Sequence, residues 1–214
     1  MRRSVTLILV LFCVTIAALA QKPFTEGVIT YNIKLRSADN QLLTGTYTFT
    51  IKADQLRKDL ALSNGYRELI LINGTDNTYY SLNNVNGTMY AIQHKMADVF
   101  KRQEKFKAFA ISGEASGSDL NELKTYKAKV KYKTGAEGDV SYTKDWYPCQ
   151  AFTYERFPDA RFLPLSYWYK NEENGMVMYL DVDKVEAKPV ESAIFRIPAD
   201  YKMITYEESQ QLRK

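Results

Sequence analysis

Apolar and polar residues alternate along most of the chain with a period of two, which is typical of β-strands that bury one face. In residues 28–35 the apolar positions fall on one side of the predicted strand. In residues 44–51 threonines fill the other side, and they suit a solvated strand face because the branched carbon packs while the hydroxyl stays wet. The pattern predicts further strands at residues 54–60, 69–72, 78–82, 88–92, 126–133, 140–146, 149–155, 166–170, 176–182, 185–188 and 192–197.

Two Asn-Gly pairs divide the centre of the chain into three of these strands. Asn73-Gly74 and Asn86-Gly87 each separate two apolar runs. Both residue types tolerate the positive φ that tight hairpin turns need. Residues 68–92 are therefore predicted to form an antiparallel meander, to which the flanking strands add.

The period changes to three and four after Ile92, which predicts an amphipathic helix over residues 95–109. Its apolar positions include Met96, Val99, Phe100 and Phe106, with basic residues between them. Such a helix can lie on a membrane surface. We favour a helix that covers the sheet, because a one-sided sheet needs a cover.

Two shorter segments complete the predicted elements. Residues 111–119 are rich in Gly and Ser and are predicted to form a loop. Thr205 and Glu208 have the spacing of a capping box, which predicts a short C-terminal helix to about residue 212. The predicted fold is mostly antiparallel β (α+β): about ten strands in a single curved sheet or half-barrel, with a covering amphipathic helix, over residues 21–214.

Residues 1–20 are expected to form a secretory signal peptide. Arg2 and Arg3 precede an apolar run, and Ala18-Leu19-Ala20 is typical of a cleavage site, so the mature chain would begin at Gln21. Cys13 lies within the apolar run, so Cys149 would be the one cysteine after cleavage. A single cysteine forms no internal disulfide, and Cys149 is predicted to be buried as a small apolar residue.

The charge balance argues against a nucleic-acid partner. The formal net charge of the chain is +4, and it falls to about +2 when Arg2 and Arg3 are removed. Lys127, Lys129, Lys131 and Lys133 share one face of a predicted strand. They could contact anionic headgroups, but strand-edge protection or a solvated face is the favoured interpretation.

The residues offer no recognisable catalytic or metal site. His94 is the only histidine, so neither a zinc site nor a Ser-His-Asp device has its usual set of residues. Asp181 and Asp183 lie two apart on one strand, but two carboxylates are too few for calcium. Nucleotide-binding glycine motifs are absent from the sequence. The sequence predicts a non-enzymatic protein with no cofactor, no metal and no catalytic residue.

Four motifs together resemble an uncharacterised family of secreted domains from Gram-negative bacteria, a domain-of-unknown-function family. They are the opening segment 24–31, Asn73-Gly-Thr with Thr78-Tyr-Tyr80, Tyr147-Pro-Cys149, and the closing segment 195–201. Such domains are similar to the periplasmic lipoprotein-carrier (LolA-like) half-barrel. The resemblance implies a curved antiparallel sheet closed by helices over an apolar hollow, and it implies no catalytic residues.

The aromatic content suits a ligand-facing concave sheet, although β-proteins are rich in aromatic residues in any case. The chain has 16 tyrosines, 10 phenylalanines and 2 tryptophans. We expect a periplasmic or extracellular module that binds a lipid or acylated peptide. The alternative is a protein-interaction or envelope-sensing module with a filled core, whose partner is another envelope protein. The expected ligand-binding residues are Tyr47, Phe49, Met96, Val99, Phe100, Phe106, Phe152, Trp168 and Met178.

Overall fold

The computed structural model describes residues 21–120, 122–170 and 175–212. The expected signal peptide, residues 1–20, lies outside these ranges, as do residues 171–174 of the turn between two predicted strands. The strands are β1 (Lys22–Phe24), β2 (Glu26–Arg36), β3 (Leu42–Lys52), β4 (Gln55–Leu62), β5 (Arg67–Asn73), β6 (Thr78–Val85), β7 (Thr88–His94), β8 (Phe109–Ser116), β9 (Thr125–Tyr132), β10 (Glu137–Thr143), β11 (Trp146–Pro148), β12 (Leu163–Lys170), β13 (Val177–Glu186) and β14 (Lys202–Thr205). The helices are α2 (Met96–Gln103) and α3 (Tyr206–Gln211), with 3₁₀ turns η2 (Glu104–Phe106) and η3 (Ser192–Phe195).

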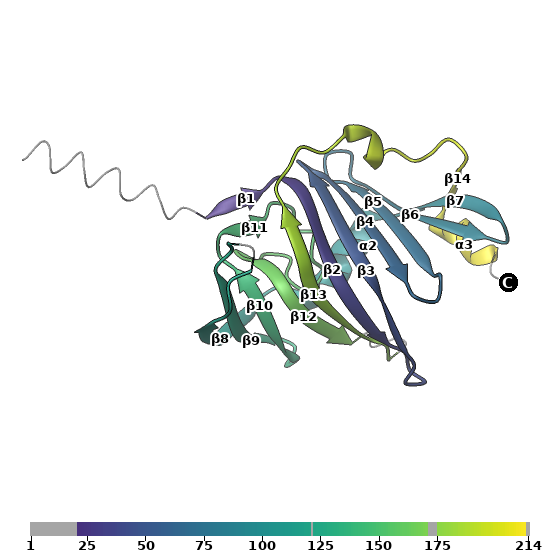
Figure 1. Cartoon of the computed structure of the whole chain (residues 1–214). Coiled ribbons are helices and arrows are strands. Elements are labelled where there is room, and N and C mark those ends of the chain that lie inside the picture. Colours follow the sequence, from purple (N-terminus) through teal and green to yellow (C-terminus); the bar gives the residue numbers. More distant parts are fainter. Residues whose placement is uncertain (1–20, 121, 171–174, 213–214) are drawn as a thin grey trace, which may run out of the picture.

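Twelve of the strands form one large sheet, in the order β14-β7-β6-β5-β4-β3-β2-β13-β12-β10-β9-β8. Its pairs are antiparallel except for β14 with β7, and β1 pairs in parallel with β11 in a small second sheet. Figure 1 shows the large sheet as a twisted, curved surface. The predicted mostly antiparallel sheet with a helix is confirmed.

Four predicted segments differ in the structure. Residues 185–186 continue β13 and do not begin a separate strand, because the pairing with β2 runs on past the bulge at Val182. Residues 109–116 form the edge strand β8 and not a loop, and a bulge between Ser112 and Ala115 accommodates the Gly-rich sequence. Residues 149–155 form successive turns between Pro148 and Pro158, with Thr153 N donating to the Gln150 carbonyl. Residues 192–195 form η3 and not a strand. Because β8 covers β9, the lysines of β9 lie one strand away from the edge and do not protect it.

The two Asn-Gly pairs form different turns. Asn86 and Gly87 have φ values of 52° and 82°, as the predicted tight hairpin requires. At the other turn the positive φ falls on Asn77, while the Asn73 side chain accepts hydrogen bonds from the backbone of Thr75 and Asp76. Gly74 is needed there for space, since an added Cβ would lie 2.8 Å from the ring of Phe152.

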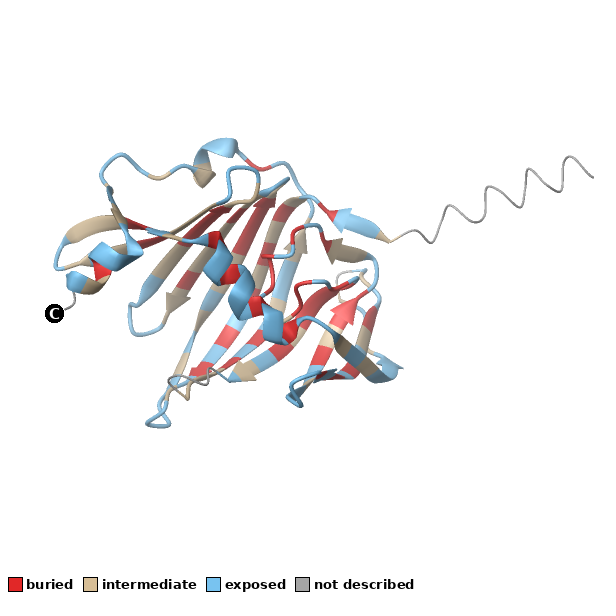
Figure 2. Cartoon of the chain, turned by 180° about the vertical axis from the view of Figure 1, so that it is seen from behind, coloured by how far each residue is buried: buried red, intermediate tan, exposed pale blue. Residues whose placement is uncertain are grey.

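Helix α2 and turn η2 replace the single predicted helix 95–109 and lie across one face of the sheet (Figure 2). We call this the inner face; it carries Tyr31, Phe49 and Tyr167. Buried residues Met96, Val99 and Phe106 attach the helix to the core. The C-terminal helix α3 begins at the predicted capping box, in which Thr205 and Glu208 bond to each other's backbone N–H groups.

The segment 149–162 fills much of the inner face with aromatic rings. Phe157 packs edge-on against Tyr167 at 5.3 Å, and Phe162 lies 4.5 Å from Tyr142. Two fully buried hydroxyls tie the segment to the sheet: Tyr31 Oη lies 2.6 Å from Tyr154 Oη and donates to the Pro164 carbonyl at 2.8 Å. The core therefore depends on a non-repetitive segment lying inside the curved sheet.

We expect Tyr31→Phe to lower the free energy of unfolding by about 2–3 kcal/mol, because it removes the hydrogen bonds of the Tyr31 hydroxyl to both the Tyr154 hydroxyl and the Pro164 carbonyl. Tyr154→Phe should cost only about 1 kcal/mol, because Tyr31 keeps its bond to the carbonyl. Tyr179→Phe, on an exposed ring, serves as the control. Urea denaturation measures all three, and equal losses for the two buried tyrosines would contradict the proposed direction of the bonds.

Candidate functional site

A cavity of about 820 Å³ opens on the inner face beside α2. Its floor comes from β4 and β12, and its rim comes from α2, η2 and the segment 153–156. The lining residues are Lys58, Asp98, Lys101, Arg102, Glu104, Lys105, Thr153, Tyr154, Glu155, Arg156, Tyr167 and Tyr169. The site is thus a tyrosine-lined hollow with a charged rim.

Lys58 is the unusual member of this lining. In β4 the side chains of Leu56, Lys58 and Leu60 all point to the inner face, so the lysine interrupts an apolar row. Its Nζ lies 4.8 Å above the ring of Phe49, and it forms no ion pair with any of the described residues. Burial lowers the pKa of Lys58 to about 8 because the cation loses water, and the charges of Glu155 and Glu68 oppose that shift only in part.

Glu68 lies on the same face, one strand further along the sheet. It is opposite Leu60 in the register, and no described residue forms an ion pair or hydrogen bond with it. Burial raises the pKa of its carboxyl, and the charge of Lys58 opposes that shift only in part. The inner face therefore holds an amine and a carboxyl that do not satisfy one another.

Positive charge dominates the rim of the cavity. The Arg156 guanidinium stacks over Phe106 at 4.1 Å and Tyr169 at 5.0 Å, and it donates to the Lys170 carbonyl at 2.9 Å. Glu104 is paired with Lys107 at 2.6 Å, which reduces the acidic charge at the rim. The arrangement can attract an anion and place its apolar part against aromatic rings.

Seven of the nine expected ligand-binding residues belong to the packed core or border it, and none of the seven lines the cavity. Close packing accounts for this, because the segment 149–162 and α2 occupy the space that an open half-barrel would leave. The buried six are Phe49, Met96, Val99, Phe106, Phe152 and Met178, and Tyr47 is half-buried against them.

The remaining two of the nine expected ligand-binding residues, Phe100 and Trp168, do not face a shared hollow on the inner face. Phe100 is 38% exposed, because the buried stripe of α2 follows Met96, Val99 and Gln103 and leaves Phe100 beside it. Trp168 is 40% exposed and lies on the opposite, outer face of the sheet, since its neighbours Tyr167 and Tyr169 take the inward positions of β12.

Cys149 is exposed, whereas the sequence predicted a buried residue. It begins the irregular segment after β11, and its Sγ lies 3.4 Å from the Phe24 carbonyl. Within the described ranges, no group of three or more His, Cys, Asp or Glu residues could hold a metal ion. No helix of the part that the structure describes is long and apolar enough to cross a membrane.

His94 has a partner that the sequence did not reveal. Its Nε2 lies 2.8 Å from Ser81 Oγ, and its ring packs between Tyr79 and Tyr206 at 4.8 and 5.2 Å. Ser81 is only 6% exposed, so its hydroxyl is not open to a substrate. The pair joins β6, β7 and α3.

The sequence did not predict the residues of the cavity, because the expected ligand site consisted of apolar side chains. One signal was present: Lys58 and Glu68 occupy inward positions in strands whose other inward residues are apolar. A charge at such a position is costly unless it has a partner or a function. Arg156 gave no comparable signal, since it lies in an irregular segment.

No family model matches the chain, and no curated protein matches it. Solved structures with some similarity include a LolA superfamily protein from Nitrosomonas europaea, with a TM-score of 0.36 and 9% identity over 83% of this chain and 92% of that one. A DUF1329 family protein from Desulfovibrio piger has a TM-score of 0.37 and 9% identity, covering 80% and 90%. A putative outer membrane lipoprotein-sorting protein domain from Vibrio parahaemolyticus has a TM-score of 0.33 and 10% identity, covering 91% and 94%.

The first and third of these descriptions name the LolA and lipoprotein-sorting class that the sequence motifs resemble. All three TM-scores are low, so the functional proposal below depends on the geometry of this chain alone.

The His94 site predicts a pH dependence of stability. Burial, and then the charge of Arg102, lower the pKa of His94 below its usual value of 6.5. The unfolded chain therefore takes up a proton first as the pH falls, and the free energy of unfolding should decrease below about pH 6.5. In His94→Gln the side chain does not titrate, so the variant lacks this pH-dependent decrease. The difference in the free energy of unfolding between wild type and variant should therefore narrow from pH 7.5 to pH 5. Urea titrations at each pH measure it, and a constant difference would refute the assignment.

Proposed function

We propose that this chain is a non-enzymatic binding module that holds an anionic amphiphile, such as a fatty acid, a lipid or an acylated peptide, in the inner cavity. The observation that carries the proposal is Lys58 at the floor of an 820 Å³ cavity: it is a desolvated cation that forms no ion pair with a described residue, and the charges of Glu155 and Glu68 offset its desolvation only in part. An unpaired buried charge costs stability, and an anionic ligand would supply the missing partner.

Tyrosine rings support a place for the apolar part of the ligand. Tyr154, Tyr167 and Tyr169 line the cavity, and Tyr169 Oη donates to Met178 Sδ at 3.2 Å. Aromatic rings offer apolar area together with a polar end, which suits a chain attached to a headgroup. The neighbouring core residues Tyr47 and Phe49 would border the chain if the cavity extended on binding.

The alternative function, a protein-interaction or envelope-sensing module, is favoured by a different observation. Segment 149–162 fills most of the apolar inner face, so little room is left beyond the cavity. A protein with a filled core would bind its partner on the surface. Titration with fatty acids of increasing chain length separates the two functions.

Export across the inner membrane is part of the proposal. Arg2, Arg3, the apolar run and Ala18-Leu19-Ala20 support a cleaved secretory signal. A periplasmic or extracellular location would give the module access to lipids and acylated peptides. N-terminal sequencing of the exported protein should begin at Gln21.

We expect saturable binding of dodecanoate, measured by isothermal titration calorimetry at pH 7. Affinity should rise roughly fourfold for each added methylene from octanoate to dodecanoate, which corresponds to about 0.8 kcal/mol of burial per methylene. Lys58→Met should weaken dodecanoate binding on the order of tenfold or more, as expected for a lost charge-assisted hydrogen bond. Lys202→Met, which removes an exposed lysine of β14, should leave the affinity for dodecanoate unchanged.

Three controls sharpen the test. The variant Lys58→Met should raise the free energy of unfolding, because an unpaired buried amine is replaced by an apolar chain of similar length, so weaker binding would not reflect unfolding. Dodecyltrimethylammonium, which carries the opposite charge, should bind poorly. Affinity for dodecanoate should fall as the pH rises above about 8, where Lys58 loses its proton. No binding at any chain length would reject the carrier and favour the interaction module.

A further inference from the structure

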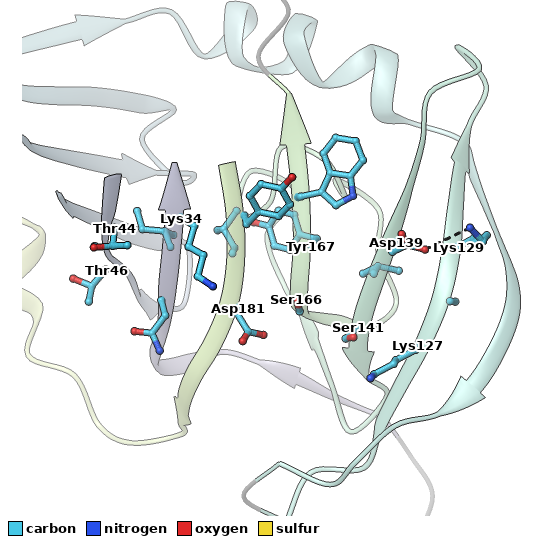
Figure 3. Close-up of a pocket in the computed structure, with 18 of the residues that line it drawn as sticks. Lys34, Thr44, Thr46, Lys127, Lys129, Asp139, Ser141, Ser166, Tyr167 and Asp181 are labelled. Atoms are coloured by element: carbon cyan, nitrogen blue, oxygen red, sulfur yellow. Dashed lines mark ion pairs between the residues drawn. The ribbon is translucent and has the colours of Figure 1, made fainter. Parts of the chain in front are cut away.

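A second hollow, of about 1120 Å³, lies on the outer face of the sheet, away from the inner cavity. Figure 3 shows its side chains rising from β3, β2, β13, β12, β10 and β9. Bulges in the pairs β13–β2 and β10–β12 interrupt the register of the strands that form it, and bulges bend strands locally. The two hollows share only Tyr167 in their linings, and the sheet separates them.

An aromatic pair forms the centre of this outer hollow. Trp168 and Tyr179 face each other across β12 and β13, with ring centroids 6.3 Å apart and planes tilted by 33°. The rings are 40% and 45% exposed, and their outward neighbours on the same strands are polar (Ser166, Lys170 and Asp181) except for Val177. Two large exposed rings side by side in the middle of a polar sheet face mark a binding surface.

A row of polar side chains runs beside the aromatic pair. Ser141, Ser166, Asp181, Asn32 and Thr46 are successive cross-strand partners over five strands. The row lies two residues from the aromatic pair, or about 7 Å along the strands. Among these five, only Asn32 has a side-chain hydrogen bond to a described residue, a long one of 3.3 Å to Asp183. Hydroxyl, carboxylate and amide groups are thus available to a ligand on the rings.

The charge of the outer hollow is mixed. Lys34, Lys127 and Lys129 face Asp139 and Asp181, and Lys129 lies 3.7 Å from Asp139. This balance does not select a polyanion. An acyl chain would cover the row of hydroxyl and carboxylate groups without bonding to it, which costs free energy.

We propose that the outer hollow binds an oligosaccharide of hexose units. A pyranose ring has an apolar C–H face, which fits the aromatic pair, and hydroxyls around its edge, which fit side chains that donate and accept hydrogen bonds. In this arrangement Trp168 stacks on one sugar ring, and Asp181 and Asn32 bond to its hydroxyls. Several strands contribute, so the hollow can accommodate more than one unit.

The test uses the two tryptophans of the chain. Trp146 lies in β11 against Phe24, outside the outer hollow, so Trp146→Phe leaves Trp168 as the only indole and its emission reports on the hollow. Cellotetraose, maltotetraose and chitotetraose are each titrated into this variant. At least one should shift and quench the Trp168 emission with saturation, and dodecanoate should not.

Calorimetry on the wild-type background tests the residues. Trp168→Ala and Asp181→Ala should each weaken binding of the responding sugar at least tenfold, while Trp146→Phe and Asp200→Ala should not. Both altered side chains are exposed, so the fold should persist, as circular dichroism will verify. The proposal is overturned if none of the three sugars changes the emission at about 10 mM, roughly ten times a Kd of about 1 mM. The oligosaccharide proposal is equally overturned if dodecanoate changes the Trp168 emission and no sugar does. Binding of dodecanoate in the inner cavity is measured separately through Lys58→Met, so failure of one proposal leaves the other standing.

Discussion

The packing of segment 149–162 against the inner face is the constraint on which the rest of the structure depends. A curved sheet of this width has more apolar surface than one short helix can cover, since α2 has only eight residues. The segment supplies the missing volume with Phe152, Tyr154, Phe157 and Phe162, all of them buried. Its polar backbone is satisfied by its own turns and by Gln103 and Tyr132, which donate to the carbonyls of Ala151 and Arg156, so an irregular chain can be buried there.

The same packing defines the inner cavity. Beside residues 153–156 of the segment, the inward positions of the sheet change from aliphatic to ionisable, with Lys58 and Glu68 in adjacent strands. Neither group has a partner among the described residues that balances its desolvation. A sheet optimised for stability alone would place leucines there, and this local conflict between burial and charge is typical of a functional site.

The sequence predicted the sheet well wherever one face was wet and the other dry. Strands β2 and β3 follow directly from their alternation, and the capping box placed α3. Strand β8 was not predicted, because its small polar residues on a bulged edge show no alternation of apolar and polar positions. Residues 149–155 alternate like a strand, but their place inside the sheet is fixed by contacts with residues more than 100 positions away, such as Tyr31, which no local pattern encodes.

The candidate sites were harder to predict. Trp168 was identified as a ligand-facing residue, but its side of the sheet depends on the parity of β12, which a one-residue change in register reverses. Lys58 was visible as a break in an apolar row, whereas the rim of the cavity is assembled from α2 and segment 153–156 only in three dimensions.

The pairing of β14 with β7 has a consequence for the order of assembly. The meander from β3 to β7 is complete in sequence by His94, yet its last strand keeps an open edge until Lys202–Thr205 arrives, more than 100 residues later. The connecting chain is held on the way by Lys52 and Arg57, which donate to the carbonyls of Val190 and Ile194. Such non-local parallel pairing forms slowly, because the loop entropy is lost before the contacts are gained. The newly made chain therefore carries an unpaired strand edge until Lys202–Thr205 has been made, and that edge is where wrong partners would attach first.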